Sequence, residues 1–189
     1  MTMTARVAAA TFILAAALAV PAGAQVPGDR TDDEVFKDVS TTVLAYPQFT
    51  IFDDVSAVVA EGVVTLKGKV TMPFKKLDIG KRVAKVPGVK RVANRIGVLP
   101  VSQYDDELRY AVARAIYGSA SFWHYASMVN PPIHIIVEGG RVTLTGVVAS
   151  HVERVMARSL AASFTALSVT SDLKTDQEMR DLLDRKGVG

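Results

Sequence analysis

The chain has 189 residues and a formal charge of +3 at pH 7, and about half of its residues are apolar, which is enough to build a folded core. It has no cysteine, and this excludes disulfides, thiolate metal sites, cysteine nucleophiles and a lipid-modified N-terminal cysteine. The charge is uneven along the chain. Residues 25–66 hold eight acids and two bases, residues 67–95 hold ten bases and one acid, and residues 96–189 hold nine bases and ten acids. One short segment therefore carries the basic character of the protein.

The N-terminus has the pattern of a secretory signal peptide. Arg6 precedes an apolar run over residues 7–20, and Pro21 and the small residues 22–24 follow it. The run is shorter than the ~20 residues that a membrane-spanning helix needs, although an uncleaved anchor is the alternative. We expect cleavage after Ala24, a linker over residues 25–30 and a periplasmic or secreted protein with no later transmembrane span.

Two sequence patterns occur twice. Asp32-Asp33-Glu34-Val35 recurs as Asp105-Asp106-Glu107-Leu108. The pattern Val-Thr-Leu-x-Gly at residues 64–68 recurs at residues 142–146. The two copies of the second pattern lie further apart than those of the first, which indicates an internal duplication in which the second copy has gained about five residues in a loop.

Each copy predicts the same order of elements. A first helix begins after Thr31, with a capping box to Glu34, and its counterpart begins after Ser102. Each is followed by a hairpin whose turn contains glycine, a second helix and a short last strand. The expected ranges are strands 55–59 and 63–67, helix 73–86 and strand 91–98 in the first copy, and strands 133–137 and 141–145, helix 151–164 and strand 168–173 in the second.

These elements predict an α+β fold of two tandem αββαβ modules, each a three-stranded mixed sheet with two helices on one face. The expected boundaries are residues 31–99 for the first module and 102–174 for the second, with a frayed helical tail over residues 175–189. Because the link over residues 99–102 is short, we expect the modules to pack against each other in a defined way.

With both copies aligned, the sequence resembles a pair of BON domains (bacterial OsmY and nodulation). The resemblance rests on Glu61-Gly62-Val63-Val64-Thr65-Leu66-Lys67-Gly68 and on Val86-Pro87-Gly88-Val89 followed by Val92-Ala93-Asn94, and the second copy is divergent in the later part. The resemblance implies αββαβ folds, a periplasmic location and non-enzymatic roles in phospholipid contact, outer-membrane maintenance and osmotic-stress protection. It supplies no catalytic motif.

The basic segment includes the second helix of the first module. The bases on this helix are Lys75, Lys76, Lys81, Arg82 and Lys85, and we expect Leu77, Val83 and Ala84 to face the sheet. Such a face predicts weak, reversible binding to an anionic lipid surface. The alternative is a solvated helix face that the acidic first helix of the same module partly neutralises.

An aromatic cluster follows the first helix of the second module, where the extra residues lie. It contains Tyr117, Phe122, Trp123 and Tyr125, and Trp123 is the only tryptophan. Amphipathic aromatic side chains on a loop favour a membrane interface. The alternative is that they fill the gap between the modules or cover the core of the second one.

Other chemistries have no supporting pattern. The histidines, His124, His134 and His151, lack metal-ligand spacing, and we find no catalytic or nucleic-acid-binding motif. We therefore predict no cofactor, no metal, no nucleic-acid partner and no enzymatic activity. The prediction is a non-enzymatic envelope or stress-associated protein that contacts anionic phospholipid, with a protein-interaction or chaperone-like module that binds envelope proteins as the alternative.

Overall fold

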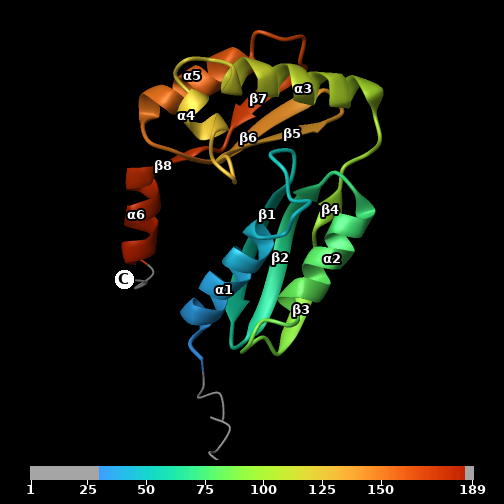
Figure 1. The fold of residues 1–189 in the computed structure, drawn as a ribbon, viewed down its shortest axis with the longest axis vertical. Helices are drawn as coiled ribbons and strands as arrows, with labels where there is room; N and C mark the ends of the chain where they lie inside the picture. Colours follow the sequence, from blue (N-terminus) through green and yellow to red (C-terminus); the bar gives the residue numbers. More distant parts are fainter. Residues whose placement is uncertain (1–29, 186–189) are drawn as a thin grey trace, which may run out of the picture.

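The computed structural model describes residues 30–185, with side chains to Leu182, so the predicted signal peptide lies outside the described residues. Two αββαβ modules follow each other, as predicted (Figure 1). Module 1 contains α1 (Asp32–Leu44), β1 (Asp54–Ala60), β2 (Val63–Val70), α2 (Pro73–Val83), β3 (Arg91–Asn94) and β4 (Gly97–Val98). Module 2 contains α3 (Gln103–Tyr117), α4 (Trp123–Ala126), β5 (Ile133–Glu138), β6 (Arg141–Val148), α5 (His151–Ala161), β7 (Ser168–Ser171) and β8 (Lys174–Thr175), and α6 (Asp176–Arg185) follows it.

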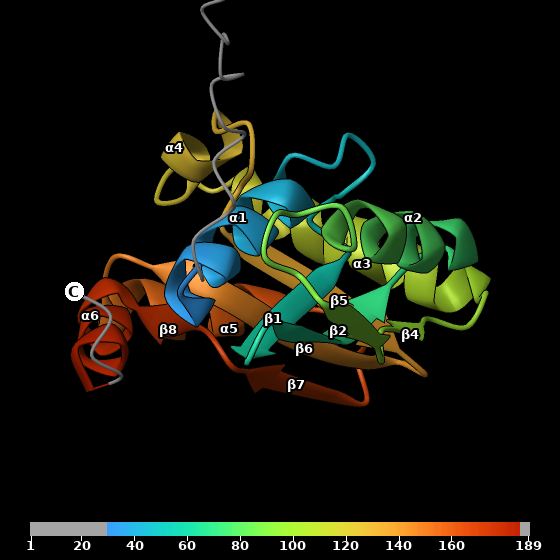
Figure 2. The same cartoon turned by 90° about the horizontal axis from the view of Figure 1, so that it is seen from below.

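Both sheets are mixed, and equivalent residues of the two modules are paired in the same register. In module 1, β1 pairs antiparallel with β2, and β3 and β4 both pair parallel with β2. Module 2 repeats this arrangement with β5, β6, β7 and β8. The single last strand predicted for each module is thus divided in two. In each module, two helices pack on one face of the sheet (Figures 1 and 2).

The helices begin where the sequence predicts. The Thr31 hydroxyl accepts a hydrogen bond from the Glu34 amide, and the Glu34 carboxylate accepts one from the Thr31 amide, which completes the capping box. The Ser102 hydroxyl caps α3. In the tail that we expected to fray, Thr175 and Glu178 form the same reciprocal pair at the start of α6.

The first aspartate of each module joins its first helix to its hairpin. The Asp32 carboxylate accepts hydrogen bonds from the amides of Glu61-Gly62, at 2.7 and 2.9 Å. The Asp105 carboxylate accepts from the amides of Gly139-Gly140, at 2.8 and 2.7 Å. All four turn residues have positive φ, which directs successive amides toward one point. The repeated aspartate therefore anchors the turn as well as favouring the helix start.

Each module has its own apolar core between the sheet and its helices. The fully buried side chains include Val35, Val39, Val64, Leu66 and Ile79 in module 1, and Ile116, Phe122, Ile133, Ile135 and Leu144 in module 2. Because each sheet is buried by its own helices, each module has a complete core, and the contacts between modules are additional.

The modules meet where the loop before β1 reaches β5. The contacts are a 2.7 Å hydrogen bond from the Ile135 amide to the Ile51 carbonyl, ring contacts of Phe49 with His134 and of Phe52 with Tyr110, and an ion pair between Lys69 and Glu138 at 3.0 Å. Ile51 and Phe52 also pack against the core of module 2. These contacts give the modules the defined packing that the short link predicts.

The aspartate clamp should be a main source of stability in module 1. We expect Asp32→Ala to lower the free energy of unfolding by about 2–3 kcal/mol, because it leaves two turn amides without their charged acceptor. Asp33 lies beside it on the same helix turn and is exposed, so Asp33→Ala should change stability by less than about 0.5 kcal/mol. Urea unfolding of both variants measures this difference, and equal losses would contradict the role of the clamp.

Candidate functional site

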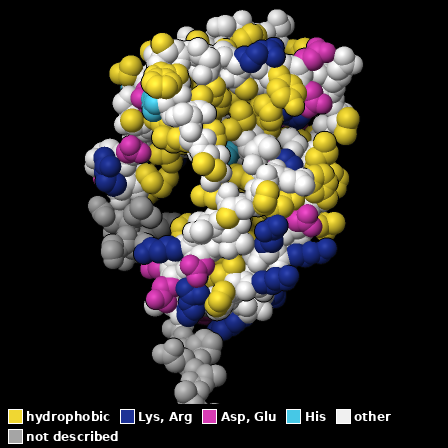
Figure 3. Space-filling view, in the orientation of Figure 1, with side chains coloured by type: hydrophobic (Ala, Val, Ile, Leu, Met, Phe, Trp, Pro, Cys, Tyr) yellow, Lys and Arg dark blue, Asp and Glu magenta, His cyan; other side chains and the backbone are white. Residues whose placement is uncertain are grey.

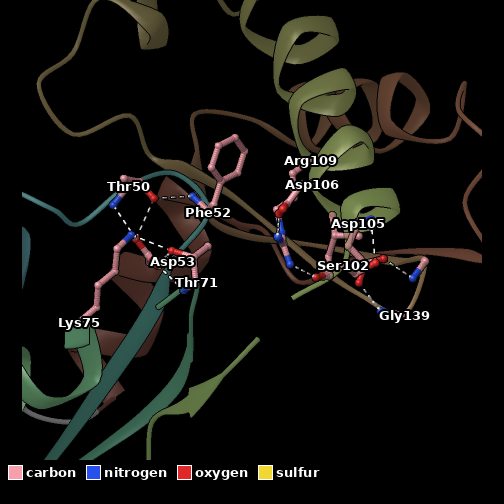
Figure 4. A network of polar contacts seen from close by, with 12 residues as sticks. Thr50, Phe52, Asp53, Thr71, Lys75, Ser102, Asp105, Asp106, Arg109 and Gly139 are labelled. Carbon is pink, nitrogen blue, oxygen red and sulfur yellow. Dashed lines mark hydrogen bonds and ion pairs between the residues drawn. The ribbon is translucent and has the colours of Figure 1, made fainter. Parts of the chain in front are cut away.

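Lys75 does not lie on the exposed face of α2, where we had placed it. Its side chain is buried and its Nζ lies 2.6 Å from Oδ2 of Asp53, which is fully buried (Figure 4). The same ammonium group donates to the Thr71 hydroxyl at 2.8 Å. Lys75 is therefore a structural residue of module 1, and it is unavailable to a ligand.

Asp53 is the centre of this buried network. Its carboxylate accepts hydrogen bonds from the amides and hydroxyls of Thr50 and Thr71 in addition to Lys75. Burial opposes ionisation of Asp53, but the hydrogen bonds from Lys75, Thr71 and Thr50 outweigh it and lower the pKa of the carboxyl. A buried ammonium group is tolerated here because its partner is ionised and fully hydrogen-bonded.

Burial of Lys75 sets which side of α2 faces outward. Lys75, Ile79 and Val83 form the buried face, and only Val83 of our three expected sheet-facing residues lies there. Leu77 and Ala84 are exposed, contrary to our prediction. At ~100° per residue, Leu77 lies nearly opposite Lys75 and Ile79, so it points away from the sheet.

The outward face of α2 is apolar at its N-terminal end and cationic at its C-terminal end. We call it the α2 surface, and its residues are Met72, Phe74, Leu77, Lys81, Arg82 and Lys85. Figure 3 shows hydrophobic side chains gathered near the start of α2 and basic side chains gathered near its end. Lys76 is half-buried at the edge of this surface.

A groove of about 730 Å³ adjoins the cationic end of the α2 surface. Lys81, Arg82 and Lys85 line one side of it, and Asp38 of α1 and Asp78 of α2 also contribute. An acidic residue of α1 thus lies near the basic residues of α2, as the alternative of partial neutralisation by α1 predicts. However, Asp38 pairs with Arg30 at 2.7 Å.

The cations of the α2 surface lack close anionic partners. Within the described residues, no carboxylate lies within 4.0 Å of the charged groups of Lys76, Lys81, Arg82 or Lys85. The Arg82 guanidinium lies 5.0 Å from the centre of the Tyr46 ring, which holds it in a cation–π contact. These charges therefore remain available to an external anion.

The equivalent helix of module 2 provides an internal comparison. When the two copies are aligned on the Val-Thr-Leu-x-Gly pattern, Phe74 and Leu77 correspond to Val152 and Val155, which are also exposed. Lys81 and Lys85 correspond to the neutral residues Ser159 and Ser163. Both helices thus expose apolar side chains near their N-terminal ends, but only α2 combines them with these lysines.

The aromatic cluster divides between the core and the surface. Phe122 is fully buried and Tyr125 is nearly so, and both belong to the core of module 2, as in our alternative. The Tyr125 hydroxyl donates to Glu153 at 2.8 Å, and burial is the main reason that its pKa rises to about 12. Trp123 differs, because 67% of it is exposed on α4.

Trp123 and the α2 surface belong to elements on one side of the molecule. Figure 2 shows α4, α1 and α2 on the same side, with β7 on the other. Figure 1 places α4 over module 2 and α2 over module 1, so the two elements are separated along the molecule.

The described residues contain no group of three or more histidine, cysteine, aspartate or glutamate side chains placed to hold a metal ion. His134 lies between the modules, where burial lowers its pKa despite the nearby Asp54. Within residues 30–185, no helix is both long and apolar enough to span a bilayer.

Comparison with known proteins agrees with this architecture. The family model of the BON domain matches residues 31–100 and 125–176. The chain belongs to the BON domain family. BON domains are non-catalytic binding modules. The second match begins after α3, so the first helix of module 2 lies outside it.

Two solved structures resemble the fold weakly. One is the C-terminal domain of CdsD, a structural protein of the type III secretion system of Chlamydia trachomatis, at 11% identity and a TM-score of 0.32 over 76% of this chain and 66% of that one. The other is a second structure of CdsD, at 12% identity and a TM-score of 0.31 over 82% and 70% of the two chains. No curated protein matches this sequence.

The buried ion pair gives a direct test of the assigned roles of the α2 lysines. We expect Lys75→Met to lower the free energy of unfolding by about 3–5 kcal/mol, because Asp53 loses its only cationic partner in the described structure. Lys81→Met on the exposed face should change it by less than about 0.5 kcal/mol. Chemical denaturation of the two variants checks this, and a similar effect of both substitutions would contradict the burial of Lys75.

Proposed function

We propose that this BON protein is an exported, non-enzymatic component of the cell envelope that binds anionic phospholipid peripherally through the α2 surface. The observation that carries the proposal is the continuous outward face of α2, where exposed apolar side chains adjoin cations without close carboxylate partners. Apolar side chains can enter the headgroup region while the cations remain at the phosphates, which is how amphipathic helices bind membrane surfaces.

The expected affinity is low. Each cation near an anionic surface contributes about 1 kcal/mol, and salt reduces this contribution. Phe74 and Leu77 add a hydrophobic contribution in proportion to the area that they insert, at about 25 cal/mol per Å². The sum favours reversible association that depends on both anionic lipid and ionic strength.

Trp123 gives a second contact in this proposal. It is exposed on α4, which lies on the same side of the molecule as α2 (Figure 2), and tryptophan side chains favour the headgroup layer of a bilayer. Because the two contacts are on different modules, simultaneous binding raises the overall affinity above that of either contact alone.

Protein binding is the second candidate function. It is favoured by the exposed apolar residues Val152 and Val155 of α5, which have the single exposed cation Arg158 beside them and serines at the positions of Lys81 and Lys85. A surface of this kind suits an apolar protein partner better than an anionic bilayer.

Co-sedimentation with vesicles distinguishes the two functions. We expect more binding to anionic than to zwitterionic vesicles, and less binding as salt increases. Lys81→Ser combined with Lys85→Ser, which copies the equivalent residues of module 2, should weaken the binding about thirtyfold at low salt, because about 1 kcal/mol is lost for each of the two cations.

The matched control is Lys67→Ser combined with Arg91→Ser. These residues are exposed on strands β2 and β3, so the control removes the same charge from a different part of module 1. If both double variants lose equal affinity, binding follows net charge and the α2 surface is not the site. Equal pelleting with both vesicle types at all salt concentrations would favour the protein-binding function.

A further inference from the structure

The contact between the modules consists of a docking loop of module 1 and a strand edge of module 2. Residues 49–52 form the docking loop, and its Ile51 carbonyl accepts a hydrogen bond from the Ile135 amide on the outer edge of β5. Ile51 lines a pocket with Arg114 and Tyr117 of α3. The docking loop therefore lies against the outer edge of β5 and the first helix of module 2.

Module 1 has the same edge, and it is open. Ala57 pairs with Leu66 as Ile135 pairs with Leu144, in the same register. The Ala57 amide therefore points away from β2, as the Ile135 amide points away from β6. No acceptor within residues 30–185 is hydrogen-bonded to it.

Side chains next to the edge are also more exposed in module 1 than in module 2. On the face of the sheet away from α1, Val58 corresponds to Ile136, and 57% of Val58 is exposed against 8% of Ile136. On the helix side, alignment of Asp32 with Asp105 places Thr41 and Leu44 at the positions of Arg114 and Tyr117. Both are exposed. Module 1 thus has an uncovered β1 edge, and the exposed Leu44 of α1 stands at the position of Tyr117.

Module 2 has a loop equivalent to the docking loop, and this loop is exposed. Val129 corresponds to Ile51 in the alignment on the Val-Thr-Leu-x-Gly pattern, and 97% of it is exposed. Met128 beside it is also exposed. No donor in the described part of the chain is hydrogen-bonded to the Val129 carbonyl. The loop therefore presents an apolar side chain and a free carbonyl, the two groups that Ile51 uses.

We propose that the loop around Val129 of one molecule docks on the α1–β1 edge of module 1 in a second copy of this chain. The contact repeats between molecules the one that already joins the two modules within the molecule. Because the loop and the edge are different surfaces, the association is head-to-tail and builds a ring or an open chain.

The contact between molecules should be weaker than the one within the chain. Ala57 is smaller than Ile135, and the Lys69–Glu138 ion pair has no counterpart because the equivalent residues are Val147 and Ala60. The intramolecular contact also benefits from the short link between the modules. Association should therefore depend on protein concentration.

Sedimentation equilibrium of the purified protein without lipid tests the proposal. We expect the average mass to rise with concentration, and Val129→Asp to weaken the association at least about tenfold because a charge enters an apolar contact. Val101→Asp is the matched control, since Val101 is 96% exposed in the link between modules. A monomer at all concentrations, or equal effects of the two variants, would overturn the proposal.

A crosslinking experiment locates the contact. The chain has no cysteine, so protein with Val129→Cys can be mixed with protein carrying Leu44→Cys and treated with a short bis-maleimide. We expect mixed dimers to form faster than with Ser159→Cys, an exposed position on α5. Equal rates would contradict the assigned edge. The proposal does not depend on lipid binding, so each can fail without the other.

Discussion

The architecture depends on an aspartate at the start of each module that binds the turn of the following hairpin. Asp32 and Asp105 each accept two turn amides, and this links the first helix to the strands after it. The strands then have one register in both modules, and the second helix crosses the same face of the sheet. This contact thus holds the first helix against the hairpin turn in both modules.

At the other end of the sheet, the modules use different chemistry at equivalent positions. In module 1, Asp53 accepts from the Thr71 amide and pairs with Lys75. In module 2, the equivalent amide of Ala149 is bonded to Tyr125 and Glu153, and Tyr125 comes from the inserted segment that contains α4. The insertion therefore replaces a buried ion pair with a hydrogen bond between a phenol and a carboxylate.

The order of elements could be predicted because it follows from local signals. The capping residues and the glycine turns each determine conformation within a few residues. The orientation of α2 could not be predicted in this way. Lys75 is buried only because Asp53, which lies in a different segment of the chain, provides its partner, and periodicity alone placed this lysine among the exposed cations. Phe122 and Tyr125 were misplaced for a similar reason, because aromatic residues suit a core and an interface equally well.

The central claim is that α2, and not its counterpart α5, contacts an anionic membrane. Depth-dependent quenching by brominated lipids tests it most directly in proteins with a single tryptophan. With Trp123→Phe as background, Phe74→Trp and Val152→Trp place the probe at equivalent positions of the two helices. We expect quenching and a blue shift on anionic vesicles for the probe at residue 74, and much less for the probe at residue 152. Equal quenching of both probes, or quenching of the probe at residue 152 alone, would contradict it.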